Sequence, residues 1–182
     1  NTVGNIGGSD IGAVSPTENA ITGIVLPDNT DHVDNIFRIV PTARIGLAKS
    51  GAITVQNIDG SFDATFTLVV ENLSLETLES IEVVDNLTDG PSPFGSYVAA
   101  GPLTNGDYTI LPAGVSGSCT VANGTANGAF NGSGQTLLVS GVTLAPEATC
   151  TVIFTARIFP AQDRLSGPFI NQAEVAGTGV LS

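Results

Sequence analysis

Lys49 is the only lysine of the chain, and its position suggests that its amine could act as a nucleophile. Residues 43–50 alternate between outward and inward positions, which is typical of a half-buried strand. By this alternation Lys49 shares a face with Ile45 and Leu47, the face expected to turn toward a core. Burial among apolar groups lowers the pKa of a lysine, and the resulting neutral amine is a nucleophile.

Two further residues could complete such a site. Asp85 shares a strand face with Val83, and Asn171 shares one with Ala173, so both are expected to point inward. A lysine in the first strand, an asparagine in the last and an acid between them resemble surface domains with an intramolecular isopeptide bond. In those domains a buried acid lets a neutral lysine attack the asparagine carboxamide. Alternatively, Lys49 and Asp85 form an ion pair, Lys49 extends to solvent, or Asp85 caps the following turn.

The two cysteines, Cys119 and Cys150, lie 31 residues apart on two expected strands. A disulfide between them would stabilise the fold by roughly 3–4 kcal/mol in the chain-entropy model. The alternative is a pair of buried free thiols. A redox-active pair is not expected, because the Cys-x-x-Cys spacing is absent.

Calcium is the cofactor that the loops could hold. Acidic residues gather in two turn-rich segments, with Asp28, Asp31 and Asp34 in one and Asp85 and Asp89 in the other. Oxygen-rich, negatively charged loops suit calcium, although the helix-loop-helix calcium pattern is missing. The alternative is that these residues are ordinary turn formers.

Enzymatic activity is not expected, and we assign no catalytic residues for turnover. The only histidine, His32, lies in a polar segment outside the regular part of the chain. A serine hydrolase needs a base beside its nucleophile, and neither G-x-S-x-G nor a phosphate-binding glycine loop occurs.

Composition excludes further classes of function. The 182 residues carry a formal net charge of −12, which disfavours binding to nucleic acid or to an anionic membrane surface. No run of about 18 apolar residues occurs, so membrane insertion is not expected. Hydrophobic residues make up 42% of the chain and charged residues 12%, which argues against a disordered acidic tail.

The regular part of the chain predicts an all-β fold. Alternation is clearest over 61–72, where Phe62, Ala64, Phe66, Leu68 and Val70 share one face. Further strands are expected at 80–85, 136–144, 148–158 and 168–176, with weaker ones at 96–100, 107–111 and 117–122. Short strands separated by turn signals indicate an antiparallel β-sandwich over 43–182. Residues 1–42 are expected to form an extended N-terminal arm.

Five segments, in order along the chain, carry a resemblance to a known family. They read IGLAKSG, GSFDATFTLVVENL, LESIEVVDNLTDG, APEATCTVIFTARI and GPFINQAEVAGTG. They resemble the conserved-repeat domain of bacterial extracellular surface proteins, a domain of unknown function. The resemblance implies an immunoglobulin-like sandwich of about seven to nine strands, and a role as stalk, spacer or surface-layer material. The chain departs from this pattern by holding one copy and a 42-residue extension.

Two functions follow as hypotheses. In the first, the chain is a self-assembling subunit of an extracellular filament or tube. The extension would act as a donor strand, with Ile21, Ile24 and Leu26 entering the sandwich of a neighbouring copy, and calcium is the candidate cofactor of this assembly. In the second, the chain is a spacer or adhesive module of a large cell-surface repeat protein. The even cysteine count fits an oxidising, extracellular compartment in either case.

Overall fold

The computed structural model divides the chain into two units, Asn1–Thr42 and Ala43–Ser182. In the second unit it describes residues 43–89, 94–104, 106–160 and 171–179. In the first unit it describes four short strands: β1 (Gly4–Ile6), β2 (Ser9–Ile11), β3 (Ala13–Val14) and β4 (Ile21–Thr22). β1 pairs antiparallel with β2, and β3 pairs antiparallel with β4.

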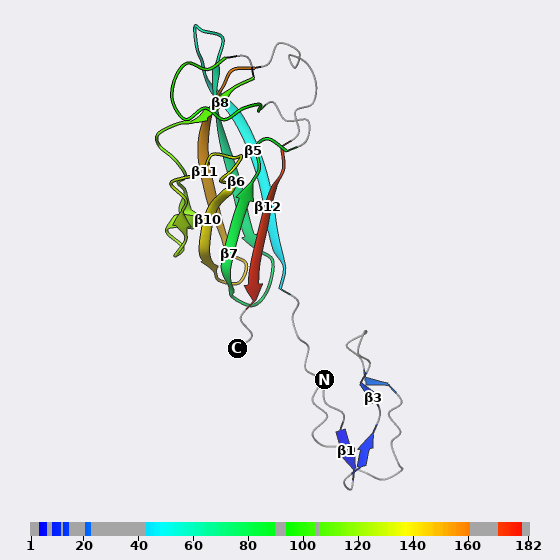
Figure 1. Ribbon diagram of the computed structural model, residues 1–182. Coiled ribbons are helices and arrows are strands. Elements are labelled where there is room, and N and C mark those ends of the chain that lie inside the picture. Colours follow the sequence, from blue (N-terminus) through cyan, green and yellow to red (C-terminus); the bar gives the residue numbers. More distant parts are fainter. Residues whose placement is uncertain are drawn as a thin grey trace. The chain divides into compact units, whose positions relative to one another are not determined.

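The second unit is an antiparallel β-sandwich (Figure 1). One sheet has the order β5-β6-β11-β8, formed by β5 (Ile45–Gln56), β6 (Phe62–Asn72), β11 (Thr149–Ile158) and β8 (Tyr108–Ile110). The other has the order β12-β7-β10-β9, formed by β12 (Ala173–Gly179), β7 (Leu78–Asp85), β10 (Leu137–Leu144) and β9 (Thr125–Ala126). The predicted all-β sandwich is therefore confirmed, with eight strands in the described part of this unit.

The core lies between the two sheets and follows the alternation of the sequence. On β6, Ala64, Leu68 and Val70 are buried, as the pattern over 61–72 predicts. β11 buries every second residue from Cys150 to Ile158. Because successive side chains of a strand point to opposite faces, each strand contributes one apolar row to this core.

Two weak strand predictions are wrong. Residues 117–122 form a short 3₁₀ helix, Ser118–Thr120, and residues 96–100 contribute only a single bridge at Tyr97. The backbone at Gly117 has a φ of 117°, and a Cβ there would lie 2.3 Å from the carbonyl oxygen of Thr151. The chain turns sharply against β11 at this point, so a regular strand cannot pass through it.

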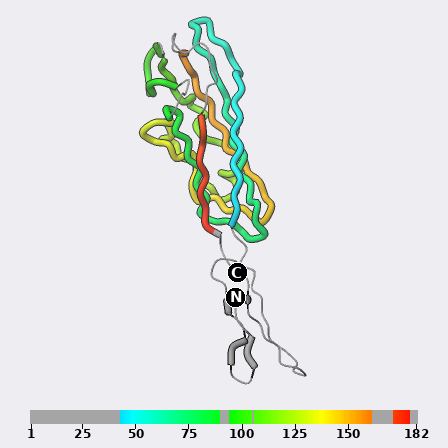
Figure 2. Tube along the Cα trace, turned by 90° about the vertical axis from the view of Figure 1, so that its right-hand side faces the viewer, coloured from blue at the N-terminus to red at the C-terminus, as the bar shows by residue number. Residues whose placement is uncertain are grey.

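The strands β5 and β12 are the terminal strands of different sheets and lie side by side (Figures 1 and 2). Ile45 at the start of β5 pairs with Asn72, and Gly179 at the end of β12 pairs with Leu78. Asn72 and Leu78 are the two ends of the connection between β6 and β7. β5 therefore begins, and β12 ends, at the same end of the sandwich.

Candidate functional site

The amine of Lys49 lies inside the sandwich, in contact with Asp85. Lys49 Nζ is 2.5 Å from Asp85 Oδ2, and the two side chains are 11% and 0% exposed. Lys49 therefore does not extend to solvent, and the structure places it in a buried ion pair. The alternation of residues 43–50 holds here because the register shift of β5 comes later, between Ile53 and Val55.

Aromatic rings surround this amine. The ring centroids of Phe66 and Phe154 lie 5.1 and 5.9 Å from Lys49 Nζ. The two rings stack on each other with centroids 5.1 Å apart. Gly51 leaves room for Phe66, because a Cβ at Gly51 would lie 2.9 Å from an atom of that ring. The amine thus has an apolar environment with one charged partner.

Asp85 ends β7 and pairs in backbone register with Ala173 of β12. Its Oδ2 accepts a hydrogen bond from Lys49, whereas its buried Oδ1 has no hydrogen-bond partner in the described part of the chain. Asp85 does not cap the turn that follows, because Asn86 does so: its Oδ1 accepts hydrogen bonds from the backbone nitrogen and hydroxyl of Thr88.

Asn171 lies two residues before β12 and next to this pair. Its Nδ2 donates a hydrogen bond to the backbone oxygen of Asn86 at 3.0 Å. Its Oδ1 is buried and, like Asp85 Oδ1, has no partner among the described residues. The amide of Asn171 also helps to stabilise the Asp85 carboxylate and so lowers its pKa, although no well-aligned hydrogen bond joins them. The structure therefore brings together all three residues that the sequence singles out.

Burial acts on both ionisable groups of the cluster in the direction of neutrality. It lowers the pKa of Lys49, and the Asp85 carboxylate offsets this only in part. It raises the pKa of Asp85, again with partial offset from Lys49. A proton can pass between the two groups without any change of net charge. The arrangement can therefore present a neutral amine beside a neutral carboxyl and a carboxamide.

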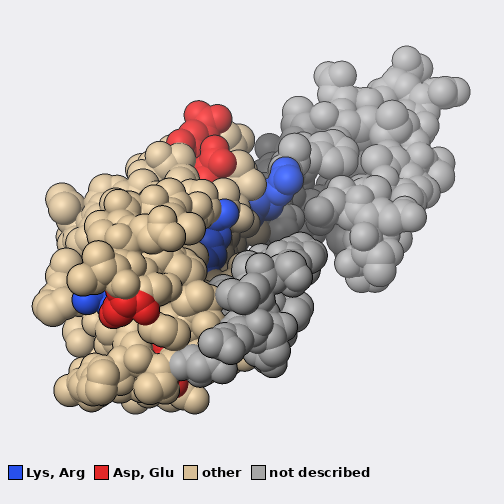
Figure 3. Space-filling model, turned by 90° about the horizontal axis from the view of Figure 1, so that it is seen from above, with Lys and Arg blue, Asp and Glu red and all other residues tan. Residues whose placement is uncertain are grey.

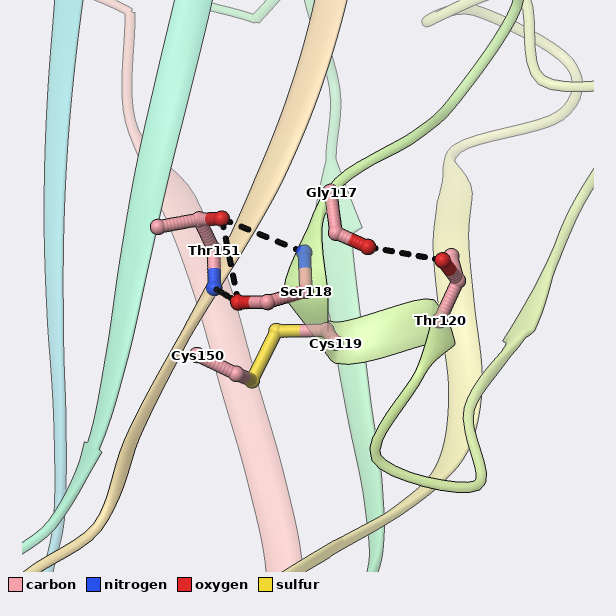
Figure 4. Close-up of a disulfide and its surroundings, with 6 residues drawn as sticks. All are labelled: Gly117, Ser118, Cys119, Thr120, Cys150 and Thr151. Atoms are coloured by element: carbon pink, nitrogen blue, oxygen red, sulfur yellow. Dashed lines mark hydrogen bonds between the residues drawn. A yellow bond between two sulfur atoms is a disulfide. The ribbon is translucent and has the colours of Figure 1, made fainter.

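The cysteines form the disulfide Cys119–Cys150, with Cα atoms 4.9 Å apart (Figure 4). It joins the 3₁₀ helix to the start of β11. Cys119 therefore lies in a 3₁₀ helix and not in the strand that the sequence predicts. Next to the disulfide, the Ser118 hydroxyl accepts a hydrogen bond from the backbone nitrogen of Thr151. The disulfide thus fixes the irregular segment after β8 to the sheet.

Of the predicted calcium ligands, the structure describes Asp85 and Asp89. Asp28, Asp31 and Asp34 lie outside the described residues. The carboxylate of Asp85 faces Lys49, and Asp89 lies in the turn after β7. Among the described residues, no group of three or more His, Cys, Asp or Glu side chains could hold a metal ion.

Of the predicted donor-strand residues, only Ile21 is described. It lies in β4, where its backbone pairs with Val14 of β3. Ile24 and Leu26 lie outside the described residues.

Sequence reasoning missed two polar interactions that organise the sandwich. Arg157 binds both carboxylate oxygens of Asp63, with Nε 2.7 Å from Oδ1 and Nη2 2.9 Å from Oδ2. The two residues are direct partners in the β6–β11 register, a relation that becomes visible only once the strands are paired. Asn72 is fully buried and binds three backbone carbonyls. An asparagine at a strand end signals a turn, but nothing in the sequence reveals these partners.

Comparisons with protein-family models, curated proteins and solved structures found no match to this chain. Within the described residues, no helix is long and apolar enough to cross a membrane. The acidic and basic side chains visible in Figure 3 are few and scattered, and no continuous basic patch appears on that face.

Proposed function

We propose that the chain is a structural subunit of an extracellular filament or tube, in which the arm of one copy adds a strand to the sandwich of the next. The observation that carries this proposal is the free edge of β5. No described strand pairs with β5 on the side away from β6. Residues 50–56 are all exposed and include no charged side chain.

An edge of this kind is a template for another strand, because its backbone groups on one side lack partners. Proteins usually protect such edges with lysine, proline or a bulge. On β5 these features are the inward-pointing Lys49 and the register shift between Ile53 and Val55, and residues 50–53 before the shift carry neither. The side chains of Ile53 and Val55 are 66% and 47% exposed, so an added strand would also cover apolar surface.

The arm supplies a matching donor. Residues 20–26, AITGIVL, include no charge and contain Ile21, Ile24 and Leu26. Among the described residues, donation would release the two-residue pairing of β4 with β3. A donated strand gains main-chain hydrogen bonds along the edge and apolar contacts for alternate side chains. Such a contact is heterologous, so repetition builds a filament or tube whenever the rotation does not close.

The partners are therefore copies of the chain itself, rather than nucleic acid, a membrane or a substrate. The disulfide supports an extracellular location, since disulfides persist in oxidising compartments. The sandwich also has the architecture implied by the resemblance to the conserved-repeat domain of surface proteins, and we propose that relationship as well. A spacer role is less well supported. Because β5 begins where β12 ends, a module inserted in series would add little length.

The test is electron microscopy and light scattering of the purified chain, in calcium and then in chelator. We expect polymers from the full chain and monomers after removal of residues 1–30. Ile53→Lys with Val55→Lys should also abolish assembly, because charges on an edge oppose strand addition. Ile58→Lys is the matched control, since Ile58 is fully exposed but lies in the turn beyond β5.

Monomers from the full chain under both conditions would overturn the assembly proposal and favour the spacer or adhesive module. Polymers that survive both edge substitutions would place the joint elsewhere. Loss of polymers in chelator alone would make calcium part of the joint.

A further inference from the structure

We propose that Lys49 and Asn171 become joined by an amide bond between Lys49 Nζ and Asn171 Cγ, with Asp85 as the acid–base residue of this self-modification. The proposal does not depend on filament assembly. It rests on the buried contact between Lys49 and Asp85, the position of Asn171 beside them, and two buried oxygen atoms that have no hydrogen-bond partner.

The fold fixes all three groups in place. Lys49 projects inward from β5, and Asp85 ends β7 in the opposite sheet. The backbone pairing of Asp85 with Ala173 brings Asn171 to the same end of β7. The hydrogen bond from Asn171 Nδ2 to the oxygen of Asn86 then orients the carboxamide. Such fixed placement makes a reaction between the groups effectively unimolecular.

The two unpartnered atoms suggest where a proton belongs. Asp85 Oδ1 and Asn171 Oδ1 are the buried side-chain atoms without a hydrogen bond in the described part of the chain. Both are acceptors when Asp85 is ionised. A proton on Asp85 would turn its carboxyl into a donor, which could then bind the carbonyl oxygen of Asn171. That hydrogen bond polarises the carbonyl for attack by an amine.

The required proton comes from Lys49. Transfer from the ammonium to the Asp85 carboxylate leaves a neutral pair, which burial favours over the ionised pair. Phe66 and Phe154 keep the amine in an apolar environment. The neutral amine is then a nucleophile.

The reaction is an amide exchange that balances without an oxidant, metal or cofactor. The Nζ lone pair attacks Cγ of Asn171 while Asp85 donates its proton toward Oδ1. Asp85 then passes a proton from Nζ to Nδ2. As the Cγ–Nδ2 bond breaks and ammonia leaves, Oδ1 returns its proton to Asp85. The products are one secondary amide and one ammonia molecule, and Asp85 ends with a proton that exchanges with solvent as the site relaxes.

The new bond would close the side of the sandwich where β5 and β12 belong to different sheets and share no strand ladder. Lys49 is four residues from the start of β5, and Asn171 is two residues before β12. The bond would therefore tie the first strand of the sandwich to the last.

Intact mass spectrometry and tryptic mapping of the purified chain test the proposal. With the disulfide reduced, the mass should fall short of the sequence by about 17 Da, one ammonia. Asparagine can also lose ammonia by forming a succinimide, so the peptide map is decisive. Trypsin should fail to cut after Lys49, and the peptide Ile45–Arg157 should be recovered joined to Leu165–Ser182.

The variants Lys49→Arg and Asp85→Asn should both restore the full mass and leave Leu165–Ser182 as a free peptide. Asp63→Asn is the matched control, because it breaks a second ion pair of the described residues, that with Arg157, and should leave the bond intact. Circular dichroism checks that each variant folds.

A wild-type chain of full mass, with normal cleavage after Lys49, overturns the proposal whatever the variants do. A deficit of about 18 Da, one water, with Leu165–Ser182 free would place the bond between Lys49 and Asp85 and would also overturn it.

Discussion

Replacing Asn72 with alanine should destabilise the sandwich more than any other single loss of an amide side chain in the described residues. Asn72 ends β6 and is fully buried. Its Nδ2 contacts the carbonyl oxygens of Glu76, Leu144 and Ala145 at 2.8, 3.0 and 2.9 Å. Its Oδ1 accepts a hydrogen bond from the backbone nitrogen of Ser74 at 2.9 Å. One side chain thus joins the β6–β7 connection to the turn between β10 and β11.

The same connection holds the start of β5. The backbone nitrogen of Arg44 donates to Ser74 Oγ at 2.6 Å, and the nitrogen of Leu73 donates to the Arg44 oxygen at 2.9 Å. Asn72 therefore fixes the point where the chain passes from residues 1–42 into the sandwich. Its loss should loosen this end first.

The magnitude follows from the four contacts. A hydrogen bond contributes about 0.5–1.5 kcal/mol net, and leaving a buried partner unsatisfied costs about 1–3 kcal/mol. Two amide hydrogens serve the three carbonyls, so the contacts are not independent. We expect Asn72→Ala to lower the free energy of unfolding by about 3–5 kcal/mol.

Urea unfolding followed by far-UV circular dichroism measures this change. Asn127→Ala is the control, since Asn127 is half-buried and makes two local contacts, to the Leu137 oxygen and the Ala129 nitrogen. Its loss should cost about 1–2 kcal/mol. A cost below about 1 kcal/mol for Asn72→Ala, or one equal to that of the control, would refute the reasoning.

Two further predictions concern the other internal links. Arg157 lowers the pKa of Asp63 below its ordinary value of 3.8, so this ion pair stabilises the fold above that pH and the stabilisation is lost as pH falls through the lowered value. The free energy of unfolding should therefore fall less steeply with decreasing pH in Asp63→Asn than in the wild type. Parallel curves for the two proteins would contradict the assignment. Replacing Cys119 and Cys150 together with serine should lower stability by roughly 3–4 kcal/mol in urea unfolding. A loss below about 1 kcal/mol would show that the unfolded chain gains little freedom without the disulfide.

The sequence predicts the fold best where side chains alternate. The row from Ala64 to Val70 and the buried face of β11 follow period two, and the structure confirms both. The prediction of a strand over 117–122 is wrong because the few apolar residues of this segment do not distinguish a strand from a turn. Its conformation is set instead by the close approach of Gly117 to Thr151, which is a tertiary contact.

The candidate site was predictable because Lys49, Asp85 and Asn171 each lie beside apolar neighbours at strand spacing. Alternation gives the face of each residue but not its partners. The contact of Lys49 with Asp85 depends on how the two sheets pack, and the placement of Asn171 depends on the β7–β12 register. The hydrogen bond from Asn171 to the backbone oxygen of Asn86 could not be predicted for the same reason, since strand register is set by the whole sheet.

The two proposals meet on β5, which carries both Lys49 and the free edge. In the proposed filament, tension reaches each subunit through the residues that precede β5. Strands pulled from one end separate by breaking their hydrogen bonds in succession, so β5 would peel away from β6 starting at Ile45. A bond at Lys49 would stop this peeling after four residues, because force would then pass through a covalent link to Asn171. Without the bond, a subunit under load would lose the strand whose free edge receives the next copy.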